Sequence, residues 1–189
     1  MHRSSPNRII WQYFDALRRL VDSLDHSEGE PARQDSALCI MLAVTIVEAF
    51  LNVYARVTVS EPKFAQHEQR VLSDLTKWKS LDYKLRKWPK VIFGKALDPT
   101  SPTVSAFFKL KDRRNALMHF TSSHETMQLT GISIQGLANT SALDALTQTD
   151  AASALKVAED MIAELLRVSG IPECKIFQAL HLWTGRVPT

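Results

Sequence analysis

Three residues of one short stretch, Arg114, Asn115 and His119, carry the side chains that phosphodiester chemistry uses. An arginine stays charged in a protein, whereas a histidine takes or gives a proton near neutral pH. One group could therefore hold anionic oxygens while the other moves protons. On an α-helix Asn115 and His119 share a face, but Arg114 and His119 point about 140° apart. One helix alone would build a poor site, whereas two copies facing each other across a two-fold axis could build a good one.

The stretch reads Arg114-Asn115-Ala116-Leu117-Met118-His119. It resembles the motif of the HEPN superfamily (higher eukaryotes and prokaryotes nucleotide-binding), which are all-helical domains marked by Arg, usually Asn, a short spacer and His. The resemblance covers roughly residues 37–120 and the closing helix, and includes the lead-in Phe-Phe-Lys-Leu-Lys-Asp before Arg113. It departs at Thr121, where many HEPN toxins paired with a nucleotidyltransferase have Tyr. Regulation through modification of that tyrosine is therefore in doubt.

The resemblance implies a metal-independent endoribonuclease that acts as a homodimer. His119 would be the general base and acid around a ribose 2′-hydroxyl, Arg114 would stabilise the phosphorane charge, and Asn115 would orient these groups. Such a protein would be a toxin or phage-defence effector, with RNA as a partner and an antitoxin or other regulatory protein as a further one. The alternative is a catalytically silent HEPN module that binds RNA, a nucleotide or a partner protein. An ordinary helix with an exposed Arg and His would also fit the motif.

Glu48 and Asn52 form a polar spot on an otherwise apolar segment, because residues four apart share a helix face. A hydrogen-bonded structural pair is the first interpretation. The second is a supporting role beside the motif, in which they orient Arg114 or Asn115. HEPN-type proteins often carry an acidic residue and an Asn in the helix beside the motif helix, which favours keeping both interpretations open.

The middle of the chain is strongly basic. From Lys77 to His119 there are eleven Lys and Arg against three acids, whereas the remaining chain is acidic. This asymmetry is typical of a surface for a polyanion, although a solvated lysine-rich segment would look the same. We expect RNA to contact Lys84, Arg86, Lys87, Lys111 and Arg113. Trp78 and Trp88, within a basic-aromatic insert at about 77–95, could stack on bases or pack in the core, and packing is the interpretation we favour.

Hydrophobic periodicity predicts a single all-α domain over residues 1–189, an antiparallel bundle of four main helices with short accessory helices. The main helices are expected at about 8–24, 32–57, 104–120 and 150–169, the second being the most buried, through Ile40, Val44, Val47 and Leu51. Shorter helices are expected after Pro62 and near 174–183, with one small β-hairpin at about 127–137. In the motif helix the predicted core positions are Val104, Phe107, Phe108, Leu110, Ala116 and Leu117.

Several other functions find no pattern in the sequence. There is no CxxC, HExxH, phosphate-cradling glycine loop or nucleophile elbow, so we expect no metal and no cofactor. The apolar run at 37–47 is too short for a membrane span. With only two cysteines, and no secretory signal visible, we expect reduced thiols in a cytoplasmic protein that does not bind a membrane.

Overall fold

The computed structural model describes residues 5–24, 28–118, 126–135 and 140–185. It shows an all-α protein with one small hairpin, as the periodicity predicted. The long helices are α1 (Arg8–Leu24), α2 (Gly29–Val59), α5 (Pro102–Met118) and α7 (Gln148–Val168). The shorter ones are α3 (Glu68–Thr76), α4 (Leu81–Phe93), α6 (Ser141–Asp144), α8 (Glu173–Thr184) and the 3-10 helix η1 (Pro62–His67).

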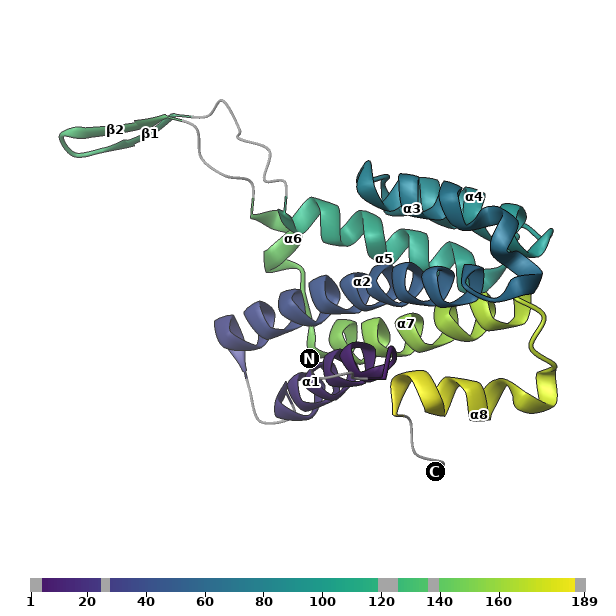
Figure 1. Ribbon diagram of the computed structural model, residues 1–189. Helices are drawn as coiled ribbons and strands as arrows, with labels where there is room; N and C mark the ends of the chain where they lie inside the picture. Colours follow the sequence, from purple (N-terminus) through teal and green to yellow (C-terminus); the bar gives the residue numbers. More distant parts are fainter. Residues whose placement is uncertain (1–4, 25–27, 119–125, 136–139, 186–189) are drawn as a thin grey trace.

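Helix α2 runs through the centre of the protein, with α1, α5 and α7 packed around it (Figure 1). Its predicted core positions Ile40, Val44, Val47 and Leu51 are all buried, which confirms that prediction. The helix starts three residues before the predicted position and includes Pro31 in its first turn, because a proline is tolerated where the backbone N–H has no helical partner. Among the described residues, α2 is also the one helix long and apolar enough to cross a membrane, but the buried core helix of a globular protein can have the same length and composition.

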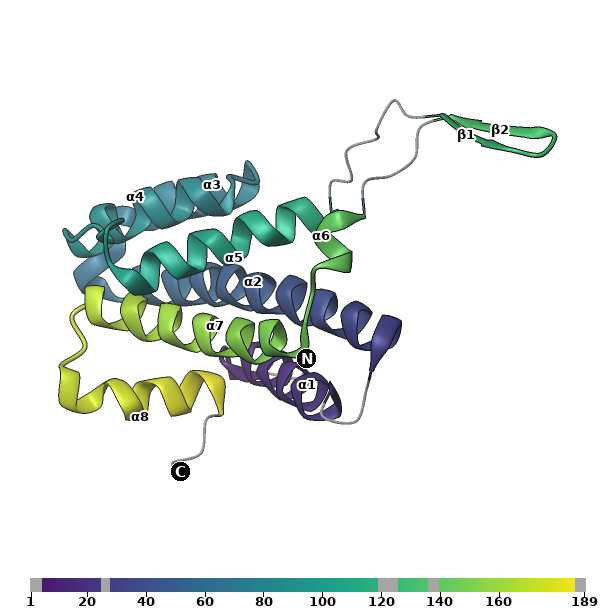
Figure 2. The ribbon, with the colours of Figure 1, turned by 180° about the vertical axis from the view of Figure 1, so that it is seen from behind.

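Helix α7 packs along α2, and α8 packs against α7. Seen from behind, α7 lies between α5 and α8 (Figure 2). Arg18 of α1 joins these helices, since its guanidinium donates to Glu159 of α7 at 2.8 Å and to the Thr184 carbonyl of α8 at 2.8 Å. The two contacts link α1 to both α7 and α8.

The predicted hairpin is present. Strand β1 (Thr126–Leu129) pairs antiparallel with β2 (Ile132–Gln135), so that Thr126 is opposite Gln135 and Leu129 opposite Ile132. It stands apart from the helices (Figure 1).

The basic-aromatic insert is largely helical. Its residues 81–93 form α4, whose first turn is capped by the Ser80 hydroxyl, which accepts from the Tyr83 N–H at 3.3 Å. Pro89 lies inside the helix and Gly94 ends it in the left-handed conformation, φ +73°. Because this segment is a helix, one face of it packs against the core and the other faces solvent.

Candidate functional site

Helix α5 positions the motif. Asp98 forms a turn before it by accepting from the N–H and hydroxyl of Thr100 at 2.8 and 2.7 Å, and Pro102 then takes the first helical position. Val104, Phe107, Leu110 and Leu117 are buried as predicted, and Phe108 is half-buried. The prediction for Ala116 is wrong. Ala116 is exposed because it lies one turn after the exposed Asp112, on the solvent side of the helix.

Arg114 and Asn115 lie near the C-terminal end of α5 and are both half-buried. The Arg114 guanidinium donates to the Met118 sulfur at 3.7 Å, a weak contact along the same helix. Within the described segments no carboxylate pairs with Arg114, and the Asn115 side chain makes no hydrogen bond. His119, the third residue of the predicted catalytic set, lies outside the described residues.

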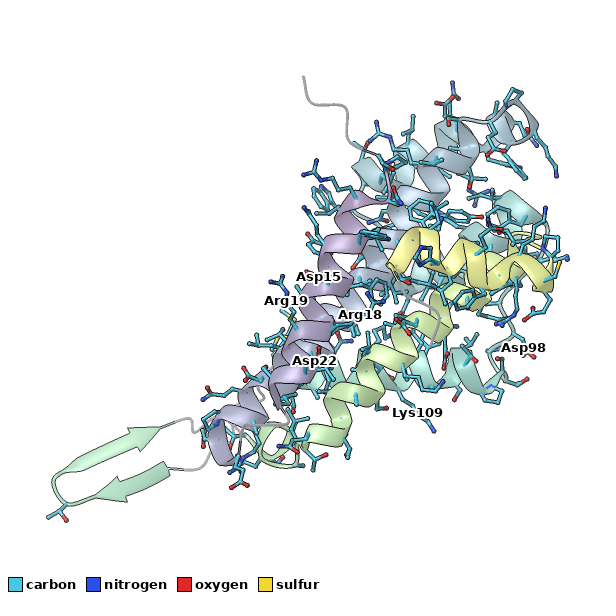
Figure 3. All side chains as sticks on the ribbon, turned by 90° about the horizontal axis from the view of Figure 1, so that it is seen from below. Asp15, Arg18, Arg19, Asp22, Asp98 and Lys109 are labelled. Carbon is cyan, nitrogen blue, oxygen red and sulfur yellow. The ribbon has the colours of Figure 1, made fainter. Side chains whose placement is uncertain are left out.

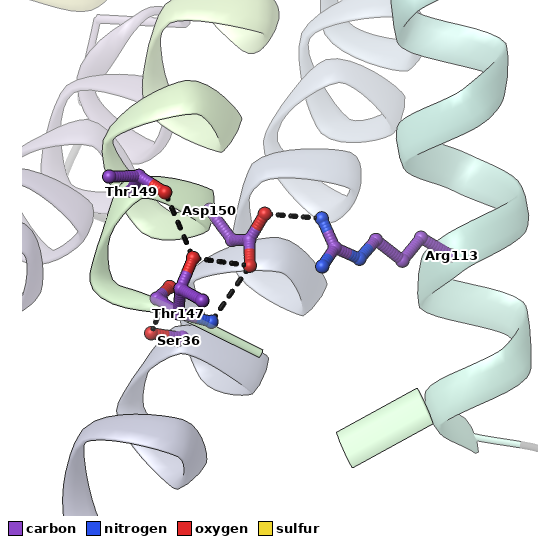
Figure 4. Close-up of polar contacts among 5 residues, drawn as sticks. All are labelled: Ser36, Arg113, Thr147, Thr149 and Asp150. Atoms are coloured by element: carbon purple, nitrogen blue, oxygen red, sulfur yellow. Dashed lines mark hydrogen bonds and ion pairs between the residues drawn. The ribbon is translucent and has the colours of Figure 1, made fainter. Parts of the chain in front are cut away.

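Arg113, next to Arg114, is held by α7. Its guanidinium lies 2.5 Å from Asp150 Oδ1, while Asp150 Oδ2 accepts from the Thr147 N–H at 2.8 Å and from the Thr147 hydroxyl at 2.9 Å (Figure 4). The Ser36 hydroxyl of α2 donates to the Thr147 carbonyl at 3.0 Å. Three helices thus meet at one cluster, which fixes the end of α5 that carries the motif.

The Asp150 carboxyl keeps its charge in this cluster. Burial by itself raises the pKa of Asp150, but the hydrogen bonds from Arg113 and Thr147 outweigh burial and hold that pKa below its usual value. Arg113 was predicted to contact RNA, and in the structure its guanidinium pairs with the Asp150 carboxylate.

Lys111, also predicted to contact RNA, is another internal anchor. Its ammonium lies 2.7 and 2.8 Å from the two oxygens of Asp82 in α4 and 3.2 Å from Asp112. Burial lowers the pKa of Lys111, but these carboxylates outweigh it and the net shift is upward. The side chain is 10% exposed, so Lys111 joins α5 to α4 and offers little charge to a ligand.

Glu48 and Lys84 form a third internal pair, which joins α2 to α4. The Lys84 ammonium lies 3.3 Å from Glu48 Oε1 and 5.7 Å from the centre of the Trp88 ring. The first interpretation of Glu48, a structural partner, is the one that this contact supports. Asn52 has a buried Oδ1 with no hydrogen-bond donor, and no hydrogen bond links Glu48 or Asn52 with Arg114 or Asn115 in the described part of the chain.

The two tryptophans of the insert differ. Trp88 is buried and its indole N–H donates to Asp74 of α3 at 3.1 Å, which confirms the packing prediction for this residue. Trp78 is 91% exposed, so the packing prediction is wrong there. Trp78 lies in the connection between α3 and α4, where it has no core surface to cover.

Trp78 also has a left-handed backbone, φ +51°. It is the second residue after α3, following the C-cap Lys77. The Trp78 N–H donates to the Leu75 carbonyl and the Lys79 N–H donates to the Asp74 carbonyl, both at 3.1 Å. This is the Schellman arrangement, in which glycine is the usual residue. A bulky residue in this conformation is strained, and here no burial compensates the strain.

Exposed cations line the solvent side of α4. Arg86, Lys87 and Lys90 are exposed, whereas Lys84 on the same helix faces inward. Lys109 of α5 is exposed too, and in Figure 3 it and Asp98 lie away from the α1 residues Asp15, Arg19 and Asp22. Of the five residues predicted to contact RNA, Arg86 and Lys87 are therefore the two that the structure leaves exposed.

An apolar hollow lies beside the motif end of α5. Leu38 and Met41 of α2, Leu117 of α5 and Leu143 of α6 line a cavity of about 310 Å³. Leu38 and Met118 are 48% and 53% exposed. Exposed apolar side chains thus occur at this end of α5, and one of them, Met118, contacts Arg114.

No cluster of three or more His, Cys, Asp or Glu that could hold a metal occurs within the ranges described. Cys39 is buried in α2, and burial together with the charge of Asp35 raises its pKa to about 11, so it stays a thiol at neutral pH. Cys174 is exposed, and neither is in a disulfide. Cysteine chemistry at Cys39 is thereby disfavoured.

Comparison of the chain with protein-family models, with curated proteins and with solved structures finds no match. The motif and the contacts around α5 are therefore the features of this chain that bear on its function.

Proposed function

We propose that the protein is a HEPN-like, metal-independent endoribonuclease that acts as a homodimer. The 2′-oxygen of RNA would attack the adjacent phosphorus as His119 takes the hydroxyl proton, and the bond to the 5′-oxygen would break as that oxygen receives a proton. Arg114 would hold the anionic oxygens of the phosphorane, since its fork of N–H donors matches them. Asn115 would orient these groups.

The observation that carries this proposal is the difference between Arg114 and its neighbours. Lys111 and Arg113 are paired with carboxylates of other helices, whereas Arg114 has only the Met118 sulfur among the described residues. A half-buried arginine without a carboxylate retains its full capacity for an anionic ligand. The internal pairs hold α5 firmly, and the remaining guanidinium is available for substrate.

The spacing of the motif is the reason for proposing a homodimer. Residues five apart point about 140° away from each other on an ideal α-helix, so a competent site would need both copies of the motif near a two-fold axis. The apolar hollow with Leu38 and Met118 lies at this end of α5 and supports a second copy as its occupant. The assignment of α1, α2, α5 and α7 as the four main helices of an antiparallel HEPN-like bundle is part of the same proposal.

The RNA-binding surface in this proposal comprises Arg86, Lys87 and Lys90 of α4 together with Trp78. The three exposed cations would hold phosphates, and the exposed indole would stack on an unpaired base. We therefore propose that the substrate is at least partly single-stranded. A toxin or phage-defence role in the cytoplasm, controlled by an antitoxin or other regulatory protein, would fit such an activity.

The direct test is RNA cleavage by EDTA-treated protein. The wild type should cleave, and His119→Ala and Arg114→Ala should each lose at least about 100-fold in rate, as expected for a lost proton-transfer group or charge stabiliser. Arg70→Ala, at an exposed arginine of α3, is the matched control and should retain the wild-type rate. Equal cleavage by wild type and His119→Ala would contradict the proposal.

A mixing experiment tests the composite site. Arg114→Ala and His119→Ala protomers, co-refolded, leave one Arg and one His at the shared site of each heterodimer. Partial cleavage that neither homodimer shows would support a site built from two chains. A fully active monomer would overturn the dimer requirement.

A silent HEPN module that binds RNA, a nucleotide or a partner protein is the second candidate. The exposed Trp78 and the cations of α4 favour it equally, because they would bind RNA whether or not the motif cleaves. RNA binding that is retained in His119→Ala, without cleavage by the wild type under any tested condition, would favour this alternative.

A further inference from the structure

A second cavity lies between α4 and α5, away from the hollow beside the motif. It has a volume of about 360 Å³. Leu85, Leu97 and Val104 contribute its apolar part, while Arg86, Lys109 and Asp112 contribute charged groups. The cavity is at the lower end of the size range of small-molecule sites, which are mainly apolar with a few polar groups that fix the ligand.

The charge of this cavity is positive. Neither Arg86 nor Lys109 forms an ion pair with any carboxylate of the described segments. Asp112, the acid of the set, lies 3.2 Å from the Lys111 ammonium, which it shares with Asp82. An anion entering here would meet the two cations Arg86 and Lys109 against one partly compensated carboxylate of the lining.

Phe108 contributes to the position of Arg86. The Arg86 guanidinium lies 5.6 Å from the centre of the Phe108 ring, and the Lys111 ammonium lies 5.3 Å from it. Cations on an aromatic ring are attracted by its negative face. Arg86 is thereby held at the cavity by an uncharged partner, which leaves its N–H donors available to an anionic group.

We propose that this cavity binds a small organic anion with one apolar ring. The ring would occupy the part formed by Leu85, Leu97 and Val104, and a carboxylate or phosphate would contact Arg86 and Lys109. The volume accommodates a ligand of about one ring and one charged group. This inference does not depend on the proposed ribonuclease activity.

Calorimetric titration with phenyl phosphate and benzoate tests the proposal, and the two probes distinguish a phosphate from a carboxylate group. Affinity should be roughly millimolar for ligands this small. Inorganic phosphate, with charge but no ring, and benzyl alcohol, with a ring but no charge, should each bind at least about tenfold more weakly. Equal binding of inorganic phosphate and phenyl phosphate would show a surface charge effect and overturn the proposal.

Variants locate the binding. Arg86→Gln should weaken both anions at least about tenfold, and Ser105→Trp should abolish binding by filling the cavity from its half-buried lining position. Lys90→Gln removes an exposed cation of α4 outside the lining and should leave affinity unchanged. Thermal unfolding of each variant verifies folding, and Lys109→Gln replaces Ser105→Trp if the latter fails to fold.

The motif variant separates this site from the proposed catalytic site. Arg114→Ala should bind phenyl phosphate as the wild type does, whatever its effect on RNA cleavage. Loss of phenyl phosphate binding in Arg114→Ala, with retention in Arg86→Gln, would place the ligand at the motif and overturn the proposal.

Discussion

The ammonium of Lys84 lies 3.3 Å from Glu48 Oε1, with only 5% of the lysine side chain exposed. Lys84 belongs to a basic segment that the sequence predicts to face solvent, but its charge is compensated by Glu48 inside the protein. The pair connects α4 to the central helix, and it removes Lys84 from the surface on which Arg86 and Lys87 remain.

Breaking this pair should destabilise the protein. Glu48→Ala leaves the buried ammonium without a carboxylate, and the free energy of unfolding should fall by about 1–3 kcal/mol. Chemical denaturation measures the change. In Glu48→Leu combined with Lys84→Met neither charge is left unpaired, so most of the loss should be recovered. A double variant as unstable as the single one would show that the packing of these side chains matters more than their charges.

The Asp150 cluster should make the free energy of unfolding depend on pH. The pKa of Asp150 is lower in the folded protein than in the unfolded chain, so its contribution is present above about pH 4 and is lost as the pH falls through the folded value. Asp150→Asn should lower the free energy of unfolding by about 1 kcal/mol at pH 7 and by less at pH 3. Asp15→Asn, which removes an exposed pair on α1, is the control and should change little at either pH. A loss in Asp150→Asn that is the same at both pH values would contradict this account.

Val44→Asp should strongly destabilise the protein. Val44 is fully buried in α2, and an unpaired carboxylate there should lower the free energy of unfolding by about 3 kcal/mol or more. Thr45→Asp, one residue away on the exposed side, should stay within about 0.5 kcal/mol of the wild type. Thermal unfolding compares the two, and equal effects would show that this turn of α2 is not core.

Trp78→Gly should stabilise the protein and weaken RNA binding together. Glycine removes the strain of the left-handed backbone, worth about 1 kcal/mol, so the midpoint of thermal unfolding should rise by about 2–4 °C. Loss of the stacking indole should weaken single-stranded RNA roughly tenfold. Trp78→Ala separates the effects, because it loses the indole but keeps the strain. Unchanged RNA affinity in both variants would exclude Trp78 from the proposed interface.

Removing exposed cations should change the salt dependence of RNA binding. Lys87→Ala with Lys90→Ala should flatten the slope of log affinity against log salt by about 1 to 2, because fewer counterions are released. Lys111→Met removes one charge from a buried pair and should leave the slope unchanged. An unaltered slope in the first variant would show that this face of α4 does not contact the polyanion.

Much of the fold could be predicted from periodicity, because core helices repeat their apolar residues at helical spacing. The prediction for α1, residues 8–24, coincides with the structure, and the hairpin was predicted from the alternation around Gly131. The helices that contain Pro31 and Pro89 were harder to predict, since whether a helix tolerates a proline depends on the position of that residue in the helix and on packing. Helix α4 was not predicted as a helix at all.

The candidate site was harder to predict from the sequence than the fold, because ion pairs form between residues far apart in the chain. Lys84, Lys111 and Arg113 look like surface cations until Glu48, Asp82 and Asp150 are placed beside them. One signal was readable: Thr147 followed three residues later by Asp150 is a helix-start pattern, and it marks the carboxylate that holds Arg113. The exposure of Trp78 had no comparable signal, since Trp88 in the same segment is buried.

The packing of α2 against α7 has a consequence for synthesis on the ribosome. About 90 residues separate the end of α2 from the start of α7, the helix that makes its most extensive contact. At roughly 5–20 residues per second, α2 is complete for about 5–20 seconds before α7 emerges. During that interval the apolar face of α2 that packs on α7 stays exposed to water. Nascent chains should therefore bind chaperones until α7 has been translated.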